Sequence, residues 1–476
     1  MLPLNRREFL SQSVKSTATA AATIAGLTSS GLTGSPFMIA SAADRTPLEI
    51  ATFRADVTPP MGHPLCGGWI KPVVGYDDSL EAIGYVLRGS GKPIVVCTLD
   101  FVGLLNEAHL EWRTAIAQAA GTTPDRVAIQ CVHQHNAPFV CPEAERLVKA
   151  AGDLPTTYDT GYLQQCLDRM LAAVVTALKT PKPLTAVAHN QAKVSQVASI
   201  RRFLNEKGQV DRWRGSATAD PALQALPEGE IDPWMKTVAF YSGEQKVAVC
   251  HYYASHPMSY YGDGRVSSEF VGLARKQRDG AEPGCVHLYF TGCSGNIAAG
   301  KYNDGTPASR IRLTERIHAA MVESEAALKP EPITSLSWTT SDLLAKPRAE
   351  FAVDKLQQQI ATKSLGTALR IRGAMMQAWM QRFESQRPIV LSGLQINQMH
   401  LLHLPAESFL EYQFRAQQFA KDRFVACAAY GDGGPWYIPV EVCYPQGGYE
   451  VSVAFCDPEI DGLMTKGIQT LLKPAV

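Results

Sequence analysis

The sequence predicts a mixed α/β fold, a largely parallel β-sheet core flanked by helices within one large domain. Three observations support this prediction. Short apolar runs typical of buried strands alternate with amphipathic segments of helical length. No linker of biased composition divides the chain after residue 43, and no internal repeat is apparent. Polar residues collect directly after the apolar runs, at the sheet edge where open α/β folds bind ligands.

The predicted strands are apolar, β-branched runs bounded by turn residues. They cover residues 93–100, 127–132, 246–253, 285–290, 389–404 and 424–429. The predicted helices have apolar residues at three- and four-residue spacing. They cover residues 105–120, 162–179, 311–328 and 355–383. The last of these is the longest, and Gly366 and Gly373 weaken it locally.

Composition excludes several classes of protein. The chain is 46% hydrophobic and 19% charged, which is ordinary for a globular protein and unlike a disordered one. Lys+Arg and Asp+Glu both number 45, so there is no overall basic field to attract nucleic acid. The 11 cysteines are too sparse for a disulfide scaffold, and no CxxC pair indicates a zinc ribbon or a thioredoxin-type site.

The N-terminus resembles a twin-arginine export signal. Arg6 and Arg7 precede an uncharged, weakly apolar stretch over residues 16–43, and Ala40-Ser41-Ala42 supplies a small-x-small cleavage site. We therefore expect a signal peptide over residues 1–42, a mature domain over residues 43–476, and a periplasmic or secreted protein. The alternative is a disordered tail that carries two arginines.

Residue types suited to metal binding or proton transfer follow the predicted strands. They are His133 and His135 after residues 127–132, His256 after residues 246–253, Ser294 after residues 285–290, Glu407 after residues 389–404, and Tyr437 and Tyr449 after residues 424–429. Because the carboxyl ends of parallel strands share one edge of a sheet, we expect these side chains to converge. Two histidines, a carboxylate and a phenol can bind Zn²⁺ and leave a position for water.

Each group taken alone has a simpler structural explanation. The spacing of His133 and His135 also occurs in hydrogen-bonded turn pairs. A carboxylate such as Glu407 is favoured in the first turn of a following helix by the helix dipole. Ser294 lacks the G-x-S-x-G spacing of a nucleophile elbow. His251, His287 and several cysteines lie within apolar runs and are read as core residues.

Six segments occur in the order found in one enzyme family. They are ADVTPP (55–60), HQHNAP (133–138), SHPM (255–258), SGNI (294–297), LPAE (404–407) and the tyrosines at 437, 444 and 449. The sequence thereby resembles the neutral/alkaline non-lysosomal ceramidases, which are zinc amidases that hydrolyse the N-acyl bond of ceramide. The resemblance covers residues 48–455 and predicts their catalytic domain without the C-terminal immunoglobulin-like domain of secreted members.

The resemblance also implies a role for each matched residue. The zinc ligands would be His133, His256, Glu407 and Tyr437. The residues acting on the substrate would be His135, Ser294, Tyr449 and an arginine that matches Arg202, with Arg201 as the alternative register. The family's H-T-H-S-G-P is HQHNAP in this chain, so the metal set is intact while the segments that shape lipid recognition are altered.

The resemblance implies an exported zinc hydrolase of linear N-acyl amides that uses zinc-activated water. Its partner would be a small-molecule N-acyl lipid or amide, with peripheral contact to a membrane surface and no nucleic acid. Two alternatives remain open. One is a metal-free serine hydrolase that uses Ser294, and the other is a non-enzymatic exported binding protein with the same fold.

Overall fold

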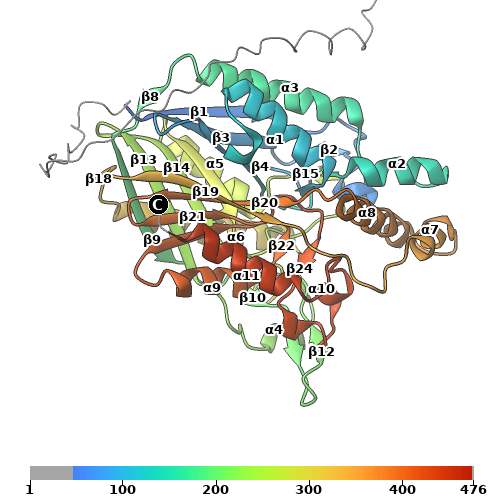
Figure 1. Cartoon of the computed structure of the whole chain (residues 1–476). Coiled ribbons are helices and arrows are strands. Elements are labelled where there is room, and N and C mark those ends of the chain that lie inside the picture. Colours follow the sequence, from blue (N-terminus) through green and yellow to red (C-terminus); the bar gives the residue numbers. More distant parts are fainter. Residues whose placement is uncertain (1–46, 474–476) are drawn as a thin grey trace, which may run out of the picture. The chain divides into compact units, whose positions relative to one another are not determined.

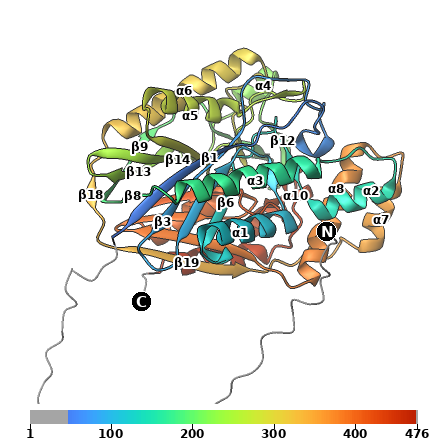
Figure 2. The ribbon, with the colours of Figure 1, turned by 90° about the horizontal axis from the view of Figure 1, so that it is seen from above.

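A computed structural model describes residues 47–473, which belong to one compact unit (Figure 1). The predicted signal peptide, residues 1–42, lies outside the described residues. Three sheets of four or five strands form the centre of the described chain, and helices cover their outer faces (Figure 2). The mixed α/β class predicted from the sequence is confirmed.

The same order of elements occurs three times along the chain. Each repeat has three antiparallel strands, a crossover helix, a fourth strand parallel to the third, and a helix that packs back on the first strand. The first repeat consists of β1 (Glu49–Asp56), β3 (Glu81–Arg88), β4 (Ile94–Leu99), α1 (Glu107–Ala120), β6 (Val127–Cys131) and α3 (Thr160–Ala177). A short strand, β8 (Lys182–Pro183), then pairs with β1 and completes the first sheet.

The second and third repeats follow the same plan. The second consists of β9 (Ala186–Lys193), β13 (Trp234–Ser242), β14 (Gln245–Tyr253), α5 (Glu269–Ala281), β16 (Val286–Thr291) and α6 (Pro307–Ala326), closed by β18 (Glu331–Pro332). The third consists of β19 (Leu336–Leu343), β20 (Ile389–Ile396), β21 (Met399–His403), α9 (Leu410–Phe419), β23 (Phe424–Ala428) and α11 (Ile460–Leu471). The expectation that the chain has no internal repeat is therefore wrong for its topology.

Strand direction also differs from the prediction. Each large sheet contains a single parallel pair, β4 with β6, β14 with β16, and β21 with β23, while its other pairs are antiparallel. The sheets are therefore mixed but mostly antiparallel, not largely parallel. Antiparallel strands such as β3 and β13 are almost entirely buried and lack the alternation of apolar and polar residues typical of antiparallel sheets, so their sequences resemble those of parallel strands.

The carboxyl ends of the parallel strands meet at one point. The Cys131 N–H donates to Tyr430 O at 2.8 Å, and the Ala429 N–H donates to Thr291 O at 2.8 Å. The Thr291 hydroxyl donates to Val132 O at 2.7 Å. These bonds join β6, β16 and β23, so the loops that follow all three strands share one region. The inner faces of the sheets pack together in a common core.

Beyond each parallel pair, a shorter parallel contact continues the pattern. β5 (Gly103–Leu104) pairs with β7 (Phe139–Val140), His256 bridges to Ala298 in β17 (Ile297–Ala298), and β22 (Glu407–Ser408) pairs with β24 (Tyr437–Ile438). Gly103, His256 and Glu407 therefore occupy equivalent positions in the three repeats. A Cβ at Gly103 would lie 2.5 Å from the Phe139 ring, so the first repeat has no room for a side chain at the position that His256 and Glu407 occupy in the other two.

Further short elements are inserted between these strands. They are the short helices α2 (Pro142–Ala151), α4 (Pro221–Ala225) and α10 (Tyr449–Ser452), the 3₁₀ turns at Cys66–Gly68, Pro124–Arg126 and Glu441–Cys443, and the short strands β2 (Gly75–Tyr76), β10 (Ser199–Ile200), β11 (Arg202–Leu204), β12 (Val210–Trp213) and β15 (Arg265–Val266).

Two predicted elements are each divided in the structure. The helix predicted over residues 355–383 is α7 (Val353–Ala361) and α8 (Thr367–Glu384), because Gly366 caps the start of α8 in an extended conformation. The strand predicted over residues 389–404 is the β20–β21 hairpin. Asn397 adopts a positive φ of 50° at the turn, where its side-chain oxygen accepts backbone N–H bonds from neighbouring segments.

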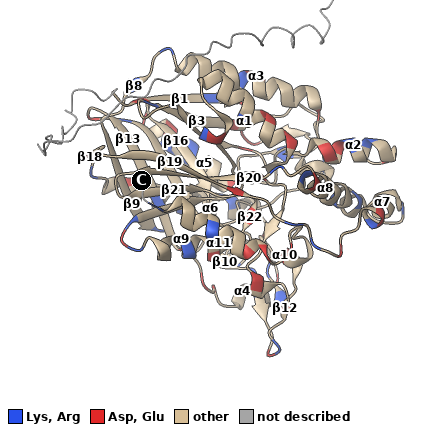
Figure 3. Ribbon diagram, in the orientation of Figure 1, with Lys and Arg blue, Asp and Glu red and all other residues tan. Residues whose placement is uncertain are grey.

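Acidic and basic residues are interspersed along the same elements (Figure 3). Within residues 47–473, no helix combines the length and apolar character needed to cross a membrane.

Candidate metal centre

The hydrogen bonds of two histidines at the strand junction leave the Nε2 atom of each ring facing the site. His133 Nδ1 lies 2.6 Å from Val102 O, and His256 Nδ1 lies 2.7 Å from Ser294 O. A carbonyl oxygen only accepts hydrogen bonds, so Nδ1 carries the proton in both rings. Each Nε2 then presents a lone pair, the arrangement usual for metal-binding histidines.

Glu407 lies between these two lone pairs. Its Oε2 is 3.0 Å from His256 Nε2 and 3.4 Å from His133 Nε2. Two ligands on a tetrahedral zinc ion, with bonds of about 2.0–2.1 Å, lie about 3.3–3.4 Å apart. Burial by itself would raise the pKa of Glu407, but His133 and His256, when protonated at Nε2 and donating to this carboxylate, hold it well below its usual range. A cation bound in place of those two protons would likewise favour the ionised carboxylate and leave both Nε2 lone pairs to act as ligands.

His135 and Tyr437 complete the group of converging donors. His135 Nε2 is 3.4 Å from His133 Nε2, and Tyr437 Oη is 3.4 Å from His256 Nε2. Nitrogen atoms of His133, His135 and His256 all lie within 4.8 Å of one another. Burial, together with the other two histidines, lowers the pKa of His135 well below its usual value, so its ring is neutral. Burial raises the pKa of Tyr437 well above 10, although Arg201 acts in the opposite direction.

The donor set fits a divalent metal ion of the zinc type. The predicted ligands His133, His256, Glu407 and Tyr437 come together as the sequence led us to expect, from loops of all three repeats. Neutral imidazoles, an ionised carboxylate and a phenol are nitrogen and oxygen ligands that Zn²⁺ accepts. His135 is near enough to be a further ligand or to contact the reacting group.

Ser294 lies beside the group but does not form a catalytic dyad with either histidine. Its Oγ contacts Tyr430 Oη at 2.8 Å, and its backbone oxygen accepts the His256 Nδ1 proton. The other nitrogen of His256 faces Glu407. Neither ring nitrogen of His256 therefore faces the Ser294 hydroxyl. A nucleophilic serine would need a histidine hydrogen-bonded to its hydroxyl to act as the base.

Tyr430 is a site residue that the sequence analysis did not identify. Its ring stacks on His133 with centroids 4.3 Å apart, and its hydroxyl bonds to Ser294 and lies 3.4 Å from His256. Tyr430 is two residues beyond β23, as His133 is two residues beyond β6. Its position directly after a predicted strand, the criterion used for the other site residues, could therefore have identified Tyr430.

These loops contain four of the non-glycine residues with positive φ in the described chain. His133, Ala406, Tyr430 and Trp436 all have positive φ, with values of 74°, 48°, 61° and 59°. Such conformations cost on the order of 1–3 kcal/mol each, and they persist where the surrounding structure fixes them. Their clustering at the junction is consistent with a functional site.

The arginine that reaches the metal-binding group is Arg201. Its Nη1 donates to Tyr437 Oη at 3.1 Å and to Gly295 O at 3.2 Å. Arg202 contacts Gln446 at 3.3 Å and Glu450 at 3.2 Å, the same carboxylate that Arg201 reaches. These contacts favour Arg201, the alternative register of the sequence analysis, over Arg202 as the arginine beside the metal-binding group.

Tyr449 lies next to Tyr437, with ring centroids 5.8 Å apart. Burial first, and the charge of Glu407 second, raise the pKa of Tyr449 to about 12. Its other face packs on Trp213 at 5.2 Å. Glu450 anchors this side of the site, since it contacts Arg201, Arg202 and the Trp213 indole N–H.

Another histidine-containing group in the described chain is structural. His251 and His287 lie in the second sheet beside Glu325, and the three could in principle hold a metal. Glu325, however, already pairs with Arg278 at 2.8 Å and with Lys246 at 2.7 Å. These cations neutralise the carboxylate, in agreement with the interpretation of both histidines as core residues.

The architecture just described defines a class, the neutral ceramidase type of mixed α/β fold. The crystal structure of neutral ceramidase from Pseudomonas aeruginosa superposes with a TM-score of 0.67 at 13% identity, covering 90% of this chain and 74% of that chain. A ceramidase complexed with C2 also gives a TM-score of 0.67 at 13% identity, covering 89% and 74%. No family model and no curated protein matches the sequence. The ceramidase fold predicted from the sequence motifs is confirmed.

Proposed function

We propose that this protein is a zinc-dependent hydrolase of linear N-acyl amides, which cleaves ceramide or a related N-acyl lipid to an amine and a fatty acid. The observation that carries the proposal is the convergence of His133, His256, Glu407 and Tyr437, with both imidazoles in the metal-binding tautomer. The likeness in fold to a protein named neutral ceramidase supports the same reaction class.

A bound Zn²⁺ would polarise the amide carbonyl and lower the pKa of a water molecule to about 7. The chain's own residues would transfer the proton, stabilise the oxyanion and position the ligands. Neutral His135, at the rim of the group, can accept a proton from water or donate a hydrogen bond to the oxyanion. Arg201 holds the Tyr437 hydroxyl, and Tyr449 provides a second phenol beside it.

Apolar side chains border the polar group. Val102, Phe139 and Trp436 line a cavity of about 10 Å³ beside His133 and Glu407, which has room for a water molecule and not for an acyl chain. The apolar border supports an amphiphilic substrate, whose acyl chain would have to lie outside this cavity.

The contacts of Ser294 favour this mechanism over a metal-free serine hydrolase. His256→Ala should abolish both metal retention and turnover of a short-chain N-acyl amphiphile, because it removes a ligand. Ser294→Ala should retain the metal and lose at most about 10²–10³ in kcat, the loss typical of one oxyanion-type contact. Loss of a true nucleophile costs on the order of 10⁶.

The assay compares both variants with wild-type protein that has been treated with a chelator and then given back zinc. Full activity without zinc, or an acyl group trapped on Ser294, would contradict the proposal. A protein that binds zinc but hydrolyses no N-acyl amide would favour the non-enzymatic alternative.

We further propose export through the twin-arginine pathway, on the sequence of residues 1–42 alone.

A further inference from the structure

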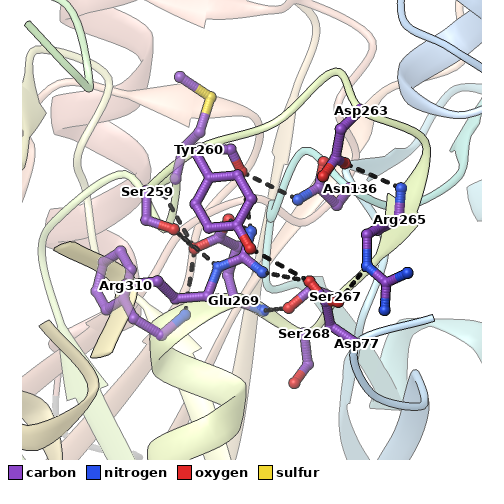
Figure 4. A network of polar contacts seen from close by, with 12 residues as sticks. Asp77, Asn136, Ser259, Tyr260, Asp263, Arg265, Ser267, Ser268, Glu269 and Arg310 are labelled. Carbon is purple, nitrogen blue, oxygen red and sulfur yellow. Dashed lines mark hydrogen bonds and ion pairs between the residues drawn. The ribbon is translucent and has the colours of Figure 1, made fainter. Parts of the chain in front are cut away.

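A buried polar network fixes the loop over residues 257–268, which connects β14 to α5 (Figure 4). Glu269, fully buried with φ of 60°, accepts hydrogen bonds from the Ser259 N–H at 3.1 Å and from its hydroxyl at 2.6 Å. The Arg310 guanidinium donates to Ser259 Oγ, Tyr260 O and Glu269 Oε1, each at 2.9 Å. It also stacks on the Tyr260 ring at 3.7 Å.

The loop is tied to its neighbours on both sides. Asn136, adjacent to His135, donates its side-chain N–H to Tyr260 O at 3.0 Å. Gly264 O accepts the Val74 N–H at 2.8 Å, and β15 then pairs with β2. Gly264 has a φ of 85°, and a Cβ there would lie 2.5 Å from the Pro72 backbone oxygen, so the two loops approach each other closely. The loop is therefore anchored on both sides of Tyr261.

This anchored loop places one aromatic side chain beside His135, on the solvent-facing side of the metal centre. The Tyr261 ring meets the His135 ring edge to face, with centroids 5.4 Å apart and an angle of 83°. Tyr261 is 46% exposed, and His135 is partly exposed, whereas His133 and His256 are buried. A substrate entering from solvent toward His135 would therefore pass along Tyr261.

The two sides of the centre differ in chemical character. Beyond Tyr437 lie Arg201 and Glu450, which are buried and paired with each other at 3.2 Å, so this side of the centre is polar and enclosed. The segments joined to the Tyr261 loop instead expose the apolar side chains Met61 at 60% and Val74 at 45%, with the exposed Lys71 between them in sequence. Aliphatic chains favour apolar surface.

We propose that Tyr261 is a specificity-determining residue, the wall against which the aliphatic acyl chain of the substrate packs beside His135. This inference rests on the proposed function and deepens it, since it assigns the acyl half of the amide to the Tyr261 side. Arg310 and Glu269 act as positioning residues, because they fix the backbone on both sides of Ser259 and Tyr260 and thereby the ring of Tyr261.

The test uses linear alkyl hydroxamates, from acetyl to octanoyl, as ligands for the zinc-loaded full-length protein. The hydroxamate head group binds the metal, so the increase in affinity with chain length reports contact along the acyl path without requiring turnover. For wild type we expect an increase of about two- to fourfold per added methylene, the upper value corresponding to full burial. Tyr261→Ala should reduce this increment to less than about 1.5-fold while leaving acetohydroxamate affinity and zinc content unchanged.

Tyr261→Phe keeps the ring and should behave as wild type. Phe419→Ala, which removes another exposed aromatic side chain at the end of α9, is the matched control and should also retain the wild-type increment. Equal increments in wild type and Tyr261→Ala, or an equal loss of affinity at every chain length, would overturn the inference. Failure of every hydroxamate to bind the zinc-loaded protein would instead contradict the metal-centred function itself.

Discussion

Glu450→Gln tests how the polar side of the centre is held in place. Glu450 is fully buried, and its carboxylate lies 3.2 Å from the guanidinium groups of both Arg201 and Arg202 and accepts the Trp213 indole N–H at 2.7 Å. Glutamine keeps the shape of the side chain but removes the charge that neutralises two buried cations.

The expected loss of stability follows from these contacts. Breaking a buried ion pair by removing one partner costs about 3–5 kcal/mol, and a retained amide hydrogen bond offsets about 1 kcal/mol of this. The net loss should therefore be about 2–4 kcal/mol. With an unfolding entropy of about 2.1 cal/mol/K per residue over about 430 residues, Tm should fall by about 2–4 °C. Because Arg201 also positions Tyr437, kcat/KM should fall about 10–100-fold.

Thermal unfolding and N-acyl hydrolysis are measured for wild type, Glu450→Gln and the control Glu206→Gln, which makes the same change on the exposed β11–β12 hairpin. Adding Arg202→Gln to Glu450→Gln removes one unpaired cation and should recover part of the lost stability. An unchanged Tm and rate in Glu450→Gln, or strictly additive losses in the double variant, would refute the reasoning.

Three further predictions concern the metal, pH and export. Gly295→Ala places a Cβ 2.3 Å from the Glu407 backbone oxygen, so zinc affinity measured against a competing chelator should fall about 10–100-fold, whereas Gly280→Ala, with open space around it, should not change it. Burial lowers the pKa of His403 to about 3, so the unfolded chain binds a proton below pH 6.5 that the folded chain excludes. Stability should thus be fully present above pH 6.5 and fall by about 2–3 kcal/mol at pH 4.5 through this group, and urea unfolding of His403→Leu should show a correspondingly shallower pH dependence. Arg6-Arg7→Lys-Lys should retain the precursor in the cytoplasm, and an unchanged exported yield in cell fractionation would show that the N-terminus is not a twin-arginine signal.

The sequence predicted the groups at the site because each one follows an apolar strand. His133, His256, Glu407 and Tyr437 could be proposed together from this placement and from the order of the motifs, and their side chains do converge. Local chemistry fixes where a strand ends and which residue comes next. Tyr430 obeys the same rule but was missed, because a tyrosine directly after an apolar strand is also typical of a core residue.

Local sequence could not decide the relation between the three sheets. The repeated order of strands and helices leaves no repeated sequence pattern, because topology depends on which strands pair rather than on residue identity. The choice of Arg201 over Arg202 likewise depends on tertiary contacts, because both guanidinium groups reach Glu450 and it is Arg201 that also donates to Tyr437. The sequence by itself determined the residue types of the site and their order. The tertiary structure alone decided that the carboxyl ends of β6, β16 and β23 meet, because that meeting depends on hydrogen bonds and core packing between residues far apart in the chain.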